Sequence, residues 1–436
     1  MLLDFSRFSI GIDGLNLALL KGTGVATYAR NLAETLNAAG CKVDLLYGLP
    51  ITRPDQQSLE FLERLGDGNF PLRPHFPEYQ WWIETFQHLR GHRATQIIIE
   101  PDIVPEALKE VVFRLPPHNR LFNDSFLFKA AQGFFKTTGR FLNITIPEGP
   151  EIMHWTYPVP LRLVGARNIY TLHDLVPLLL PETTLDHKPL YRRLIQKIVK
   201  EADGLCTVSE TSKNDIIRLF PKSADRLVNT FQPYIPDVVI EKMTYGDSAE
   251  IVRKITYCKP GEYYLFFGQL EPKKNIGRIL EAFLNSSTER PLILVGSTGW
   301  KQEAELRLLP KALASGRVKH VPYLAKTDLM ALLRHARALL FPSIAEGFGL
   351  PVLEAFSLGT PVLTSGRGAL REVAGDCALL VDPYDVRSIC EGINRFDYND
   401  ELCRKFSYAG KERCKVFSRE NYLKRLEALY KMVLYG

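Results

Sequence analysis

The sequence alternates short apolar runs with amphipathic helical stretches, and this alternation limits most strongly how the chain folds. Glycine or proline bounds most of the apolar runs, as in strands that are buried on both faces. Strands that alternate with helices build βαβ units and mostly parallel sheets. The sequence therefore predicts an α/β protein with doubly wound sheets.

The alternating pattern occurs once in each half of the chain. In the first half we expect strands near 5–13, 41–48, 151–155, 168–174 and 204–209, and helices at 24–40, 188–203 and 210–220. In the second half we expect strands at 262–268, 291–296, 318–323, 336–343, 361–365 and 377–383, and helices at 275–286, 303–315, 326–336 and 351–359.

Chain length agrees with this duplication. A chain of 436 residues is too long for one core, because single cores stop growing at roughly 250–300 residues. We expect an N-terminal domain at 1–240, a C-terminal domain at 241–415 and a last helix at 416–436 that packs toward the N-terminal domain. The stretch from Pro50 to Pro150 lacks a clear period and is expected to contain long loops.

Composition and charge exclude several classes of protein. The 46% hydrophobic and 24% charged residues are typical of a folded, soluble protein. A net charge of +6 is too small for a nucleic-acid coat but suits a cleft for a phosphorylated ligand. Seven cysteines without a C-x-x-C pair indicate neither disulfides nor zinc, as in a cytoplasmic protein. Asp4 and Arg7 interrupt any signal peptide, and no apolar run reaches the ~20 residues of a membrane span.

Two glutamates in AEGFGLPVLEA (345–355) form the strongest local candidate for a binding site. Pro351 suits the first position of a helix, so the loop before it would present backbone N–H groups at a helix N-terminus, which attracts phosphate. Glu354 would then accept hydrogen bonds from ribose hydroxyl groups, and Glu346 from those of a sugar. The alternative is that both glutamates are solvated or cap the helix.

A basic turn, FGQLEPKKN (267–275), is the second candidate. It places Lys273 and Lys274 at the carboxyl end of a strand, where open α/β sheets bind ligands. Two ammonium groups there can neutralise a diphosphate. The competing interpretation is a solvated turn.

The glycine-rich segment GTGVAT (22–27) could be a dinucleotide-binding fingerprint, since Asp44 follows Gly24 at the required distance. However, Thr27 stands where the third glycine is needed, and a long loop separates the segment from the preceding strand. NAD binding is therefore disfavoured. His173 ends the apolar strand IYTLHD, where a histidine is either structural or functional.

Taken in order, five segments resemble the retaining glycosyltransferases of family 4. EGFGLPVLEA is similar to their E-x7-E element and GQLEPKKN to their G-x-L-E-P-[RK]-K-N turn. The remaining matches are GIDGLNLALLKGTGVATYARNL (11–32), TLHDLVPLLLPE (171–182) and TVSETSKNDI (207–216). The resemblance implies a GT-B fold, in which two Rossmann-like domains face each other across a cleft. The C-terminal domain would hold a sugar-nucleotide donor and the N-terminal domain the acceptor.

The resemblance also implies roles for residues of the C-terminal domain. Glu346 would bind the transferred sugar, Glu354 the ribose, and the backbone of Gly349 and Leu350 the phosphates. Lys274 would bind the diphosphate together with Lys273.

In the N-terminal domain, His173 would face the donor sugar, so that His173, Glu346 and Lys274 form the expected catalytic set. Gly22, Thr23 and Gly24 would line the cleft near the diphosphate and the acceptor.

Gln269 is a departure from the family pattern, because many members have arginine directly after the glycine of the phosphate turn. An amide cannot replace a bidentate cation. The donor diphosphate beside Gln269 would therefore rely on Lys273 and Lys274.

For the reaction, the resemblance implies transfer of a hexose with retention at its anomeric carbon and without a protein nucleophile. No D-x-D triplet occurs in the sequence, so we expect no metal and no other cofactor. The segment HDLVPLLLPE is most similar to bacterial mannosyltransferases of polysaccharide and lipopolysaccharide assembly, which favours GDP-mannose and a glycan or lipid-linked glycan acceptor. Other hexoses and UDP stay open. So do a GT-B-fold epimerase or hydrolase of sugar nucleotides and a non-catalytic sugar-nucleotide-binding protein.

The segment 108–143 carries six basic and two acidic residues and several phenylalanines. Such a segment either lies on anionic lipid, at the cytoplasmic face of a membrane, or forms a helix that packs its phenylalanines into the N-terminal core. The second interpretation is preferred.

Overall fold

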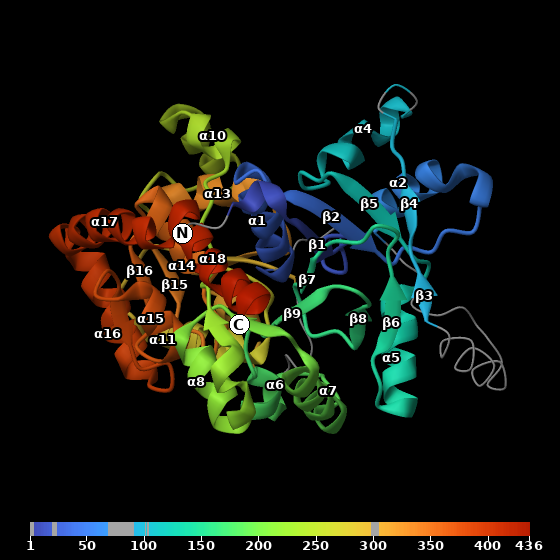
Figure 1. The fold of residues 1–436 in the computed structure, drawn as a ribbon. Helices are drawn as coiled ribbons and strands as arrows, with labels where there is room; N and C mark the ends of the chain where they lie inside the picture. The colour runs from blue at the N-terminus through green and yellow to red at the C-terminus, as the bar shows by residue number, and fades with distance from the viewer. Residues whose placement is uncertain (1–3, 20–23, 69–90, 101, 103, 298–304) are drawn as a thin grey trace.

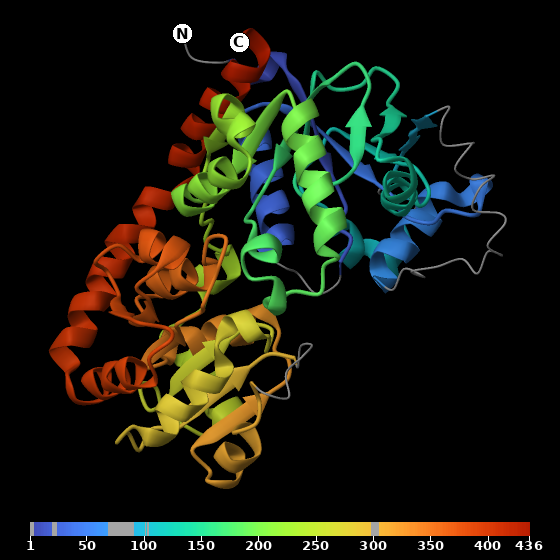
Figure 2. The same cartoon turned by 90° about the horizontal axis from the view of Figure 1, so that it is seen from below.

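Each half of the chain folds into an α/β domain in the computed structural model, and the two domains lie side by side (Figures 1 and 2). The structure describes residues 4–19, 24–68, 91–100, 102, 104–297 and 305–436. Within these ranges the expected strands and helices are present, displaced by a few residues at most of their ends. Of the helix expected at 303–315, residues 303 and 304 lie outside the described residues, and only Leu309–Ala314 is helical. The predicted α/β class is confirmed.

The N-terminal domain is built on an eight-stranded sheet in the order β11-β10-β9-β7-β1-β2-β5-β4. Neighbouring strands are parallel except β4 and β5. The strands are β1 (Ser9–Asp13), β2 (Lys42–Tyr47), β4 (Thr95–Ile97), β5 (Arg120–Asn123), β7 (Ile152–Trp155), β9 (Arg167–Thr171), β10 (Gly204–Thr207) and β11 (Leu227–Asn229). The helices are α1 (Gly24–Ala38), α2 (Gln57–Asp67), α4 (Glu106–Phe113), α5 (Leu127–Thr138), α6 (Val176–Leu179), α7 (Lys188–Glu201) and α8 (Glu210–Leu219).

The described part of the stretch from Pro50 to Pro150 is more ordered than the sequence indicated. It supplies β4 and β5 to the main sheet. It also supplies β3 (His92–Arg93) and β6 (Leu142–Thr145), which form a small parallel sheet with β8 (Leu161–Leu163). These strands are two to four residues long, which is too short to produce a recognisable period.

The C-terminal domain is built on a six-stranded parallel sheet in the order β14-β13-β12-β15-β16-β17. Its strands are β12 (Tyr264–Phe267), β13 (Leu292–Val295), β14 (Val318–Val321), β15 (Ala338–Phe341), β16 (Val362–Ser365) and β17 (Leu379–Val381). Its helices are α9 (Val238–Lys242), α10 (Tyr245–Thr256), α11 (Ile276–Asn285), α12 (Leu309–Ala314), α13 (Lys326–His335), α14 (Leu350–Leu358), α15 (Gly368–Ala374), α16 (Val386–Tyr398) and α17 (Asp400–Cys414).

The strand order reverses between β12 and β15. The chain builds outward from β12 through β13 to β14 and then returns to β15 on the other side of β12. At such a point the connections after the two strands leave toward opposite faces, so a crevice opens at the carboxyl ends. The basic turn at 267–275 follows β12, and the segment with the two glutamates, 345–355, follows β15.

Most phenylalanines of the segment 108–143 lie in the N-terminal core. Phe122, Phe134, Phe135 and Phe141 are buried among the residues of one apolar cluster, and Phe126 is half-buried. Phe113, in contrast, is 84% exposed. The segment is not one helix, because it runs from the end of α4 through β5 and α5 to the start of β6. The preferred interpretation, packing into the core, therefore holds for these phenylalanines except Phe113.

The last helix, α18 (Arg419–Tyr435), leaves the C-terminal domain and crosses the N-terminal domain (Figure 2). Gly204 of β10 permits this approach, because a Cβ atom there would lie 2.5 Å from a methyl carbon of Val433. The buried Tyr430 hydroxyl hydrogen-bonds to His154 Nδ1 at 2.9 Å. The chain therefore passes between the two domains twice, once at 230–245 and once just before α18.

Among the helices of the described ranges, none is long and apolar enough to cross a membrane.

Replacement of Tyr430 by phenylalanine tests the docking of α18. The substitution keeps the ring but leaves the buried His154 Nδ1 without its partner, so we expect the free energy of unfolding to fall by about 1–3 kcal/mol. Urea denaturation measures the change. Tyr435→Phe is the matched control, since Tyr435 lies on the same helix and is 71% exposed. Equal stability of the two variants would contradict the role of the hydrogen bond.

Candidate active site

Two turns meet where the strand order of the C-terminal domain reverses. The first follows β12 and contains a short 3-10 helix, Pro272–Lys274, and the second joins β15 to α14. Asn275 is fully buried and has a positive φ of 66°. Its side-chain amide donates to the carbonyl oxygens of Pro342 at 3.0 Å and Pro383 at 2.7 Å. This residue therefore fixes the two turns to each other.

Lys274 and Glu346 form an ion pair across these turns. The distance from Lys274 Nζ to Glu346 Oε1 is 2.6 Å, and the side chains are only 14% and 11% exposed. Burial by itself would raise the pKa of Glu346, but the ammonium groups of Lys274 and Lys273 outweigh it and hold that pKa below its usual value. Glu346 is therefore an ionised carboxylate.

Lys273 lies beside the same carboxylate. Its Nζ is 3.4 Å from Glu271 Oε1. Burial by itself would lower the pKa of Lys273, but the carboxylates of Glu346 and Glu271 outweigh this and raise it. The basic turn is thus a partly buried cluster of alternating charges rather than a solvated turn.

The loop before α14 brings a helix N-terminus to this cluster. Gly349 is the N-cap residue, with φ of 116°, and a Cβ atom there would lie 2.6 Å from Leu370 Cδ2. The position therefore requires glycine. Pro351 stands in the first turn, where the N–H groups have no acceptor within the helix. Phosphate oxygens are suitable acceptors for such groups.

Glu354 lies one turn further along α14. Its carboxylate makes no hydrogen bond or ion pair with a described residue. Burial raises the pKa of Glu354, and Lys326 opposes only part of this shift. The side chain is half-buried and lines a cavity between the domains.

His173 lies in the N-terminal domain, in the loop that follows β9. Its Nε2 lies 2.8 Å from the carbonyl oxygen of Thr156, and its ring packs edge-on against Tyr28 with 4.9 Å between centroids. Burial lowers the pKa of His173, against the effect of the Thr156 hydrogen bond. A neutral ring that donates from Nε2 leaves Nδ1 as a hydrogen-bond acceptor.

The loops that carry His173 and Glu346 touch each other. A Cβ atom on Gly347 would lie 2.9 Å from Asp174 Oδ2 and 3.0 Å from the carbonyl oxygen of His173. Close by, the carboxylate of Glu372 on α15 accepts hydrogen bonds from the backbone N–H groups of Glu210 at 2.8 Å and Thr211 at 3.0 Å, at the start of α8. The domains are therefore in direct contact around the candidate site.

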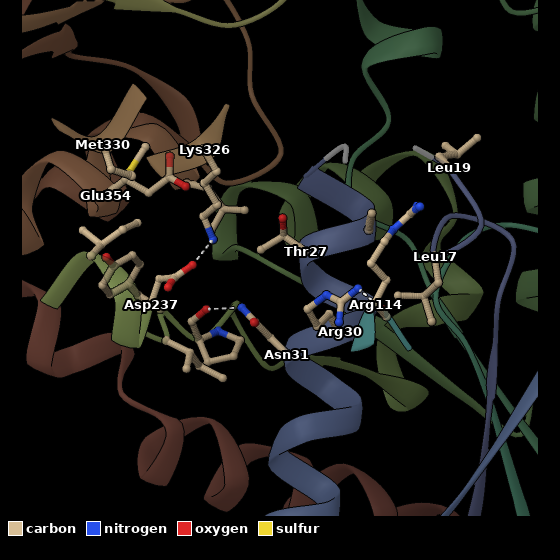
Figure 3. A pocket seen from close by; sticks show the side chains of 16 residues that line it. Leu17, Leu19, Thr27, Arg30, Asn31, Arg114, Asp237, Lys326, Met330 and Glu354 are labelled. Atoms are coloured by element: carbon tan, nitrogen blue, oxygen red, sulfur yellow. Dashed lines mark hydrogen bonds and ion pairs between the residues drawn. The ribbon is translucent and has the colours of Figure 1, made fainter. Parts of the chain in front are cut away.

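A cavity of about 240 Å³ lies between the domains beside this contact (Figure 3). The C-terminal domain and the linker provide one wall and α1 with its neighbours the other. The lining residues are Leu17, Leu19, Ala26, Thr27, Arg30, Asn31, Arg114, Pro233, Tyr234, Ile235, Asp237, Ile240, Lys326, Met330, Leu350 and Glu354.

The remaining predicted site residues are Gly22, Thr23, Gly24 and Gln269. Gly24 begins α1, and a Cβ atom there would lie 3.9 Å from Leu350 Cδ1, so this end of α1 faces the start of α14. Gly22 and Thr23 lie outside the described residues. Gln269 is exposed. Among the described residues its one hydrogen-bond partner is the N–H group of Glu271, which donates to the carbonyl oxygen of Gln269.

Sequence reasoning missed three features of the site. Asp13 is buried at the end of β1 and accepts a hydrogen bond from the N–H group of Thr156, the residue whose carbonyl oxygen binds His173. Glu372 also contributes to the contact between the domains, and Arg30 lines the cavity between them. The one feature of the sequence that could have indicated any of them is Asp13 in GIDG, a carboxylate at the end of a buried strand.

Comparison with protein families agrees with this geometry. Residues 247–413 match the family model described as glycosyl transferases group 1, and residues 23–229 match the glycosyl transferase 4-like domain. Over 277 residues the chain is 33% identical to the O-antigen chain mannosyltransferase B of Escherichia coli, covering 61% of this chain and 71% of that protein. The chain belongs to the group 1 glycosyltransferases.

Other relatives of this glycosyltransferase match over smaller parts of their own length. The serotype-specific mannosyltransferase WbdA of Escherichia coli is 30% identical over 54% of this chain and 30% of its own length. The MMP alpha-(1->4)-mannosyltransferase of Mycolicibacterium hassiacum is 28% identical over 57% of this chain and 60% of its own length.

Solved structures establish the fold of the glycosyltransferase. Sucrose-phosphate synthase from Thermosynechococcus elongatus superposes with a TM-score of 0.65, at 17% identity and over 98% of both chains. HepE of Anabaena, in complex with UDP and glucose, superposes with a TM-score of 0.63, at 14% identity, over 97% of this chain and 99% of that one. The predicted GT-B fold is confirmed.

Replacement of Gly347 by alanine tests the contact between the two loops. The added methyl group would push the glycine loop away from Asp174, and a misplacement of about 1 Å in an active site costs about 10²-fold in rate. We expect turnover of the sugar nucleotide to fall by about that factor, with little change in melting temperature. Gly133→Ala on α5 is the control, because no atom lies within 4 Å of the added carbon. Full activity of Gly347→Ala would show that the loops need not touch.

Proposed function

We propose that the enzyme transfers a mannosyl group from GDP-mannose to a glycan acceptor, with retention at the anomeric carbon and without a metal or other cofactor. Support for the sugar comes from the relatives, several of which are named mannosyltransferases. Support for the chemistry comes from the arrangement of His173, Lys274 and Glu346.

The observation that carries the proposal is the buried Lys274–Glu346 pair in front of the α14 N-terminus. The diphosphate of the donor lies against the ammonium groups of Lys273 and Lys274 and the N–H groups of Gly349 and Leu350. Charge that develops on the departing phosphate is stabilised there by groups that are already in position.

The donor sugar lies between Glu346 and His173. Glu346 accepts hydrogen bonds from sugar hydroxyl groups, and the Nδ1 atom of His173 accepts one from the opposite side. Because Glu346 is held by Lys274, it orients the sugar and does not act as a nucleophile. The departing phosphate takes the proton of the attacking hydroxyl group, so that the protein supplies position and charge.

The nucleoside follows the first turn of α14. Glu354, whose carboxylate is otherwise without a partner among the described residues, accepts hydrogen bonds from the ribose hydroxyl groups. Gln269 stands beside the diphosphate without contributing a charge.

The acceptor approaches from the N-terminal domain. We propose a glycan or a lipid-linked glycan, in keeping with the O-antigen chain mannosyltransferase among the relatives. Contact with a membrane through the phenylalanines of 108–143 forms no part of the proposal, because most of these side chains are packed in the core and only Phe113 among them is strongly exposed.

Release of nucleotide from a panel of sugar nucleotides tests the function. With a crude glycan acceptor we expect GDP release from GDP-mannose and little release without acceptor. Rapid acceptor-independent release would indicate a hydrolase, conversion of the sugar without release an epimerase, and binding without turnover a non-catalytic protein.

Lys274→Ala should remove about 2–4 kcal/mol of transition-state stabilisation, or about 10²–10³ in turnover, the scale for one preorganised donor. Transfer of radiolabelled mannose measures the loss. Lys415→Ala is the control, since Lys415 is 73% exposed and pairs with Glu412. Transfer by Lys274→Ala at the rate of the control would contradict the assignment.

Affinity for GDP should depend on the ionisation of Glu354. Because burial raises the pKa of Glu354, the carboxylate loses its charge as the pH falls through a range above that of an ordinary glutamate, near pH 4.3. We expect calorimetric titrations to show GDP affinity that weakens in this range for the wild-type protein. In Glu354→Gln the affinity should be weaker at neutral pH and nearly independent of pH. The same pH profile in both proteins would exclude a role for Glu354.

A further inference from the structure

The interdomain cavity has two chemically different ends (Figure 3). The end of the cavity that the C-terminal domain forms carries Glu354, Met330 and Lys326. There, Lys326 Nζ is 3.6 Å from Asp237 Oδ2. Arg30 and Arg114 lie at the opposite end with Leu17. The proposed ribose partner, Glu354, is thus on the other side of the cavity from the two guanidinium groups.

The two arginines are built into the wall. Arg30, on α1, donates from Nη2 to the carbonyl oxygen of Arg114 at 2.6 Å. Both guanidinium groups also lie near the buried phenol of Tyr47. Burial raises the pKa of Tyr47, and the charges of Arg30 and Arg114 both oppose that rise. Two like charges therefore share one end of the cavity.

Neither arginine forms an ion pair with a carboxylate in the part of the chain that the structure describes. Arg120, in contrast, pairs with Asp44. The carboxylate of Asp13 also lies near Tyr47 but forms no ion pair with either arginine. Two guanidinium groups without an ion-pair partner among the described residues can attract an anion into a half-enclosed site, because charge-assisted hydrogen bonds from arginine to phosphate or carboxylate are strong.

This end of the cavity lies away from the proposed position of the donor diphosphate. α1 begins at Gly24, against Leu350 at the start of α14. Arg30 is six residues further along α1, which corresponds to about 9 Å of helix rise. An anion held by Arg30 and Arg114 thus belongs to a different group from the diphosphate at Lys274.

We propose that Arg30 and Arg114 form a subsite for an anionic group, phosphate or carboxylate, on the acceptor. The inference rests on the proposed function, which brings the acceptor in from the N-terminal domain. The subsite selects acceptors that carry their negative charge about one or two sugar units from the hydroxyl group that is glycosylated. Neutral glycans bind without this contact.

Binding of a second anion to the GDP-bound protein tests the subsite. GDP at saturating concentration fills the donor site, and inorganic pyrophosphate or glucuronate is then titrated by calorimetry. We expect the wild-type protein to bind one of these probes, and Arg30→Gln and Arg114→Gln each to bind it at least ten-fold more weakly. Preference for pyrophosphate identifies a phosphate on the acceptor, and preference for glucuronate an acidic sugar.

Three controls make the result specific. Arg387→Gln removes an exposed arginine of α16 and should bind the probe like the wild-type protein. Arg30→Lys keeps the charge and should retain part of the affinity, and the melting temperature of each variant shows that it is folded.

Failure of the GDP-bound wild-type protein to bind either probe would overturn the subsite, as would equal affinity in all variants. A parallel loss of GDP affinity in Arg30→Gln would also overturn it and assign the cavity to the donor. Failure of GDP itself to bind the wild-type protein would instead contradict the proposed function.

Discussion

The buried side-chain amide of Asn275 holds together the two turns on which the candidate site is built. Parallel strands alone bring the carboxyl ends of β12 and β15 to the same edge of the sheet, without fixing the loops that follow. Asn275 adopts a left-handed conformation and binds the carbonyl oxygens of Pro342 and Pro383. With the turns in this arrangement, Lys274 reaches Glu346, and the ion pair stands in front of the α14 N-terminus. A preorganised charge of this kind requires little reorganisation when a phosphate departs.

The second half of the site depends on contact between the domains. The loop that carries His173 reaches the candidate site because it lies against Gly347. A second contact is made by Glu372, which joins α15 to the start of α8. Phe348, in the loop before α14, packs against Phe417 with 5.5 Å between the ring centroids. Phe417 lies just before α18, the helix that crosses back to the N-terminal domain. The loop before α14, to which sugar binding is assigned by proposal, is therefore coupled to the segment where the domains are joined.

Much of the fold followed from the sequence, because buried parallel strands are continuous apolar runs and the helices between them are amphipathic. The two-to-four-residue strands before Pro150 were missed, since runs so short carry no period. Glu346 and Glu354 can be predicted from their spacing around a proline and two glycines, which together define a loop and a helix start, and Lys274 from its place in a basic turn after a strand. Arg30 and Arg114 were not, because their proximity arises from the tertiary fold: a helix of the first βαβ unit meets the end of a helix about eighty residues later. A single sequence likewise gives no sign that Glu372 would contact α8.

The central claim is that a nucleoside diphosphate lies between Lys274 and the start of α14. A crystal structure of the protein with GDP tests it most directly. The account predicts the terminal phosphate within hydrogen-bonding distance of Lys274 Nζ and of the backbone nitrogens of Gly349 and Leu350, with the ribose at Glu354. Density for GDP elsewhere, with the Lys274–Glu346 pair unchanged and closed to phosphate, would contradict it.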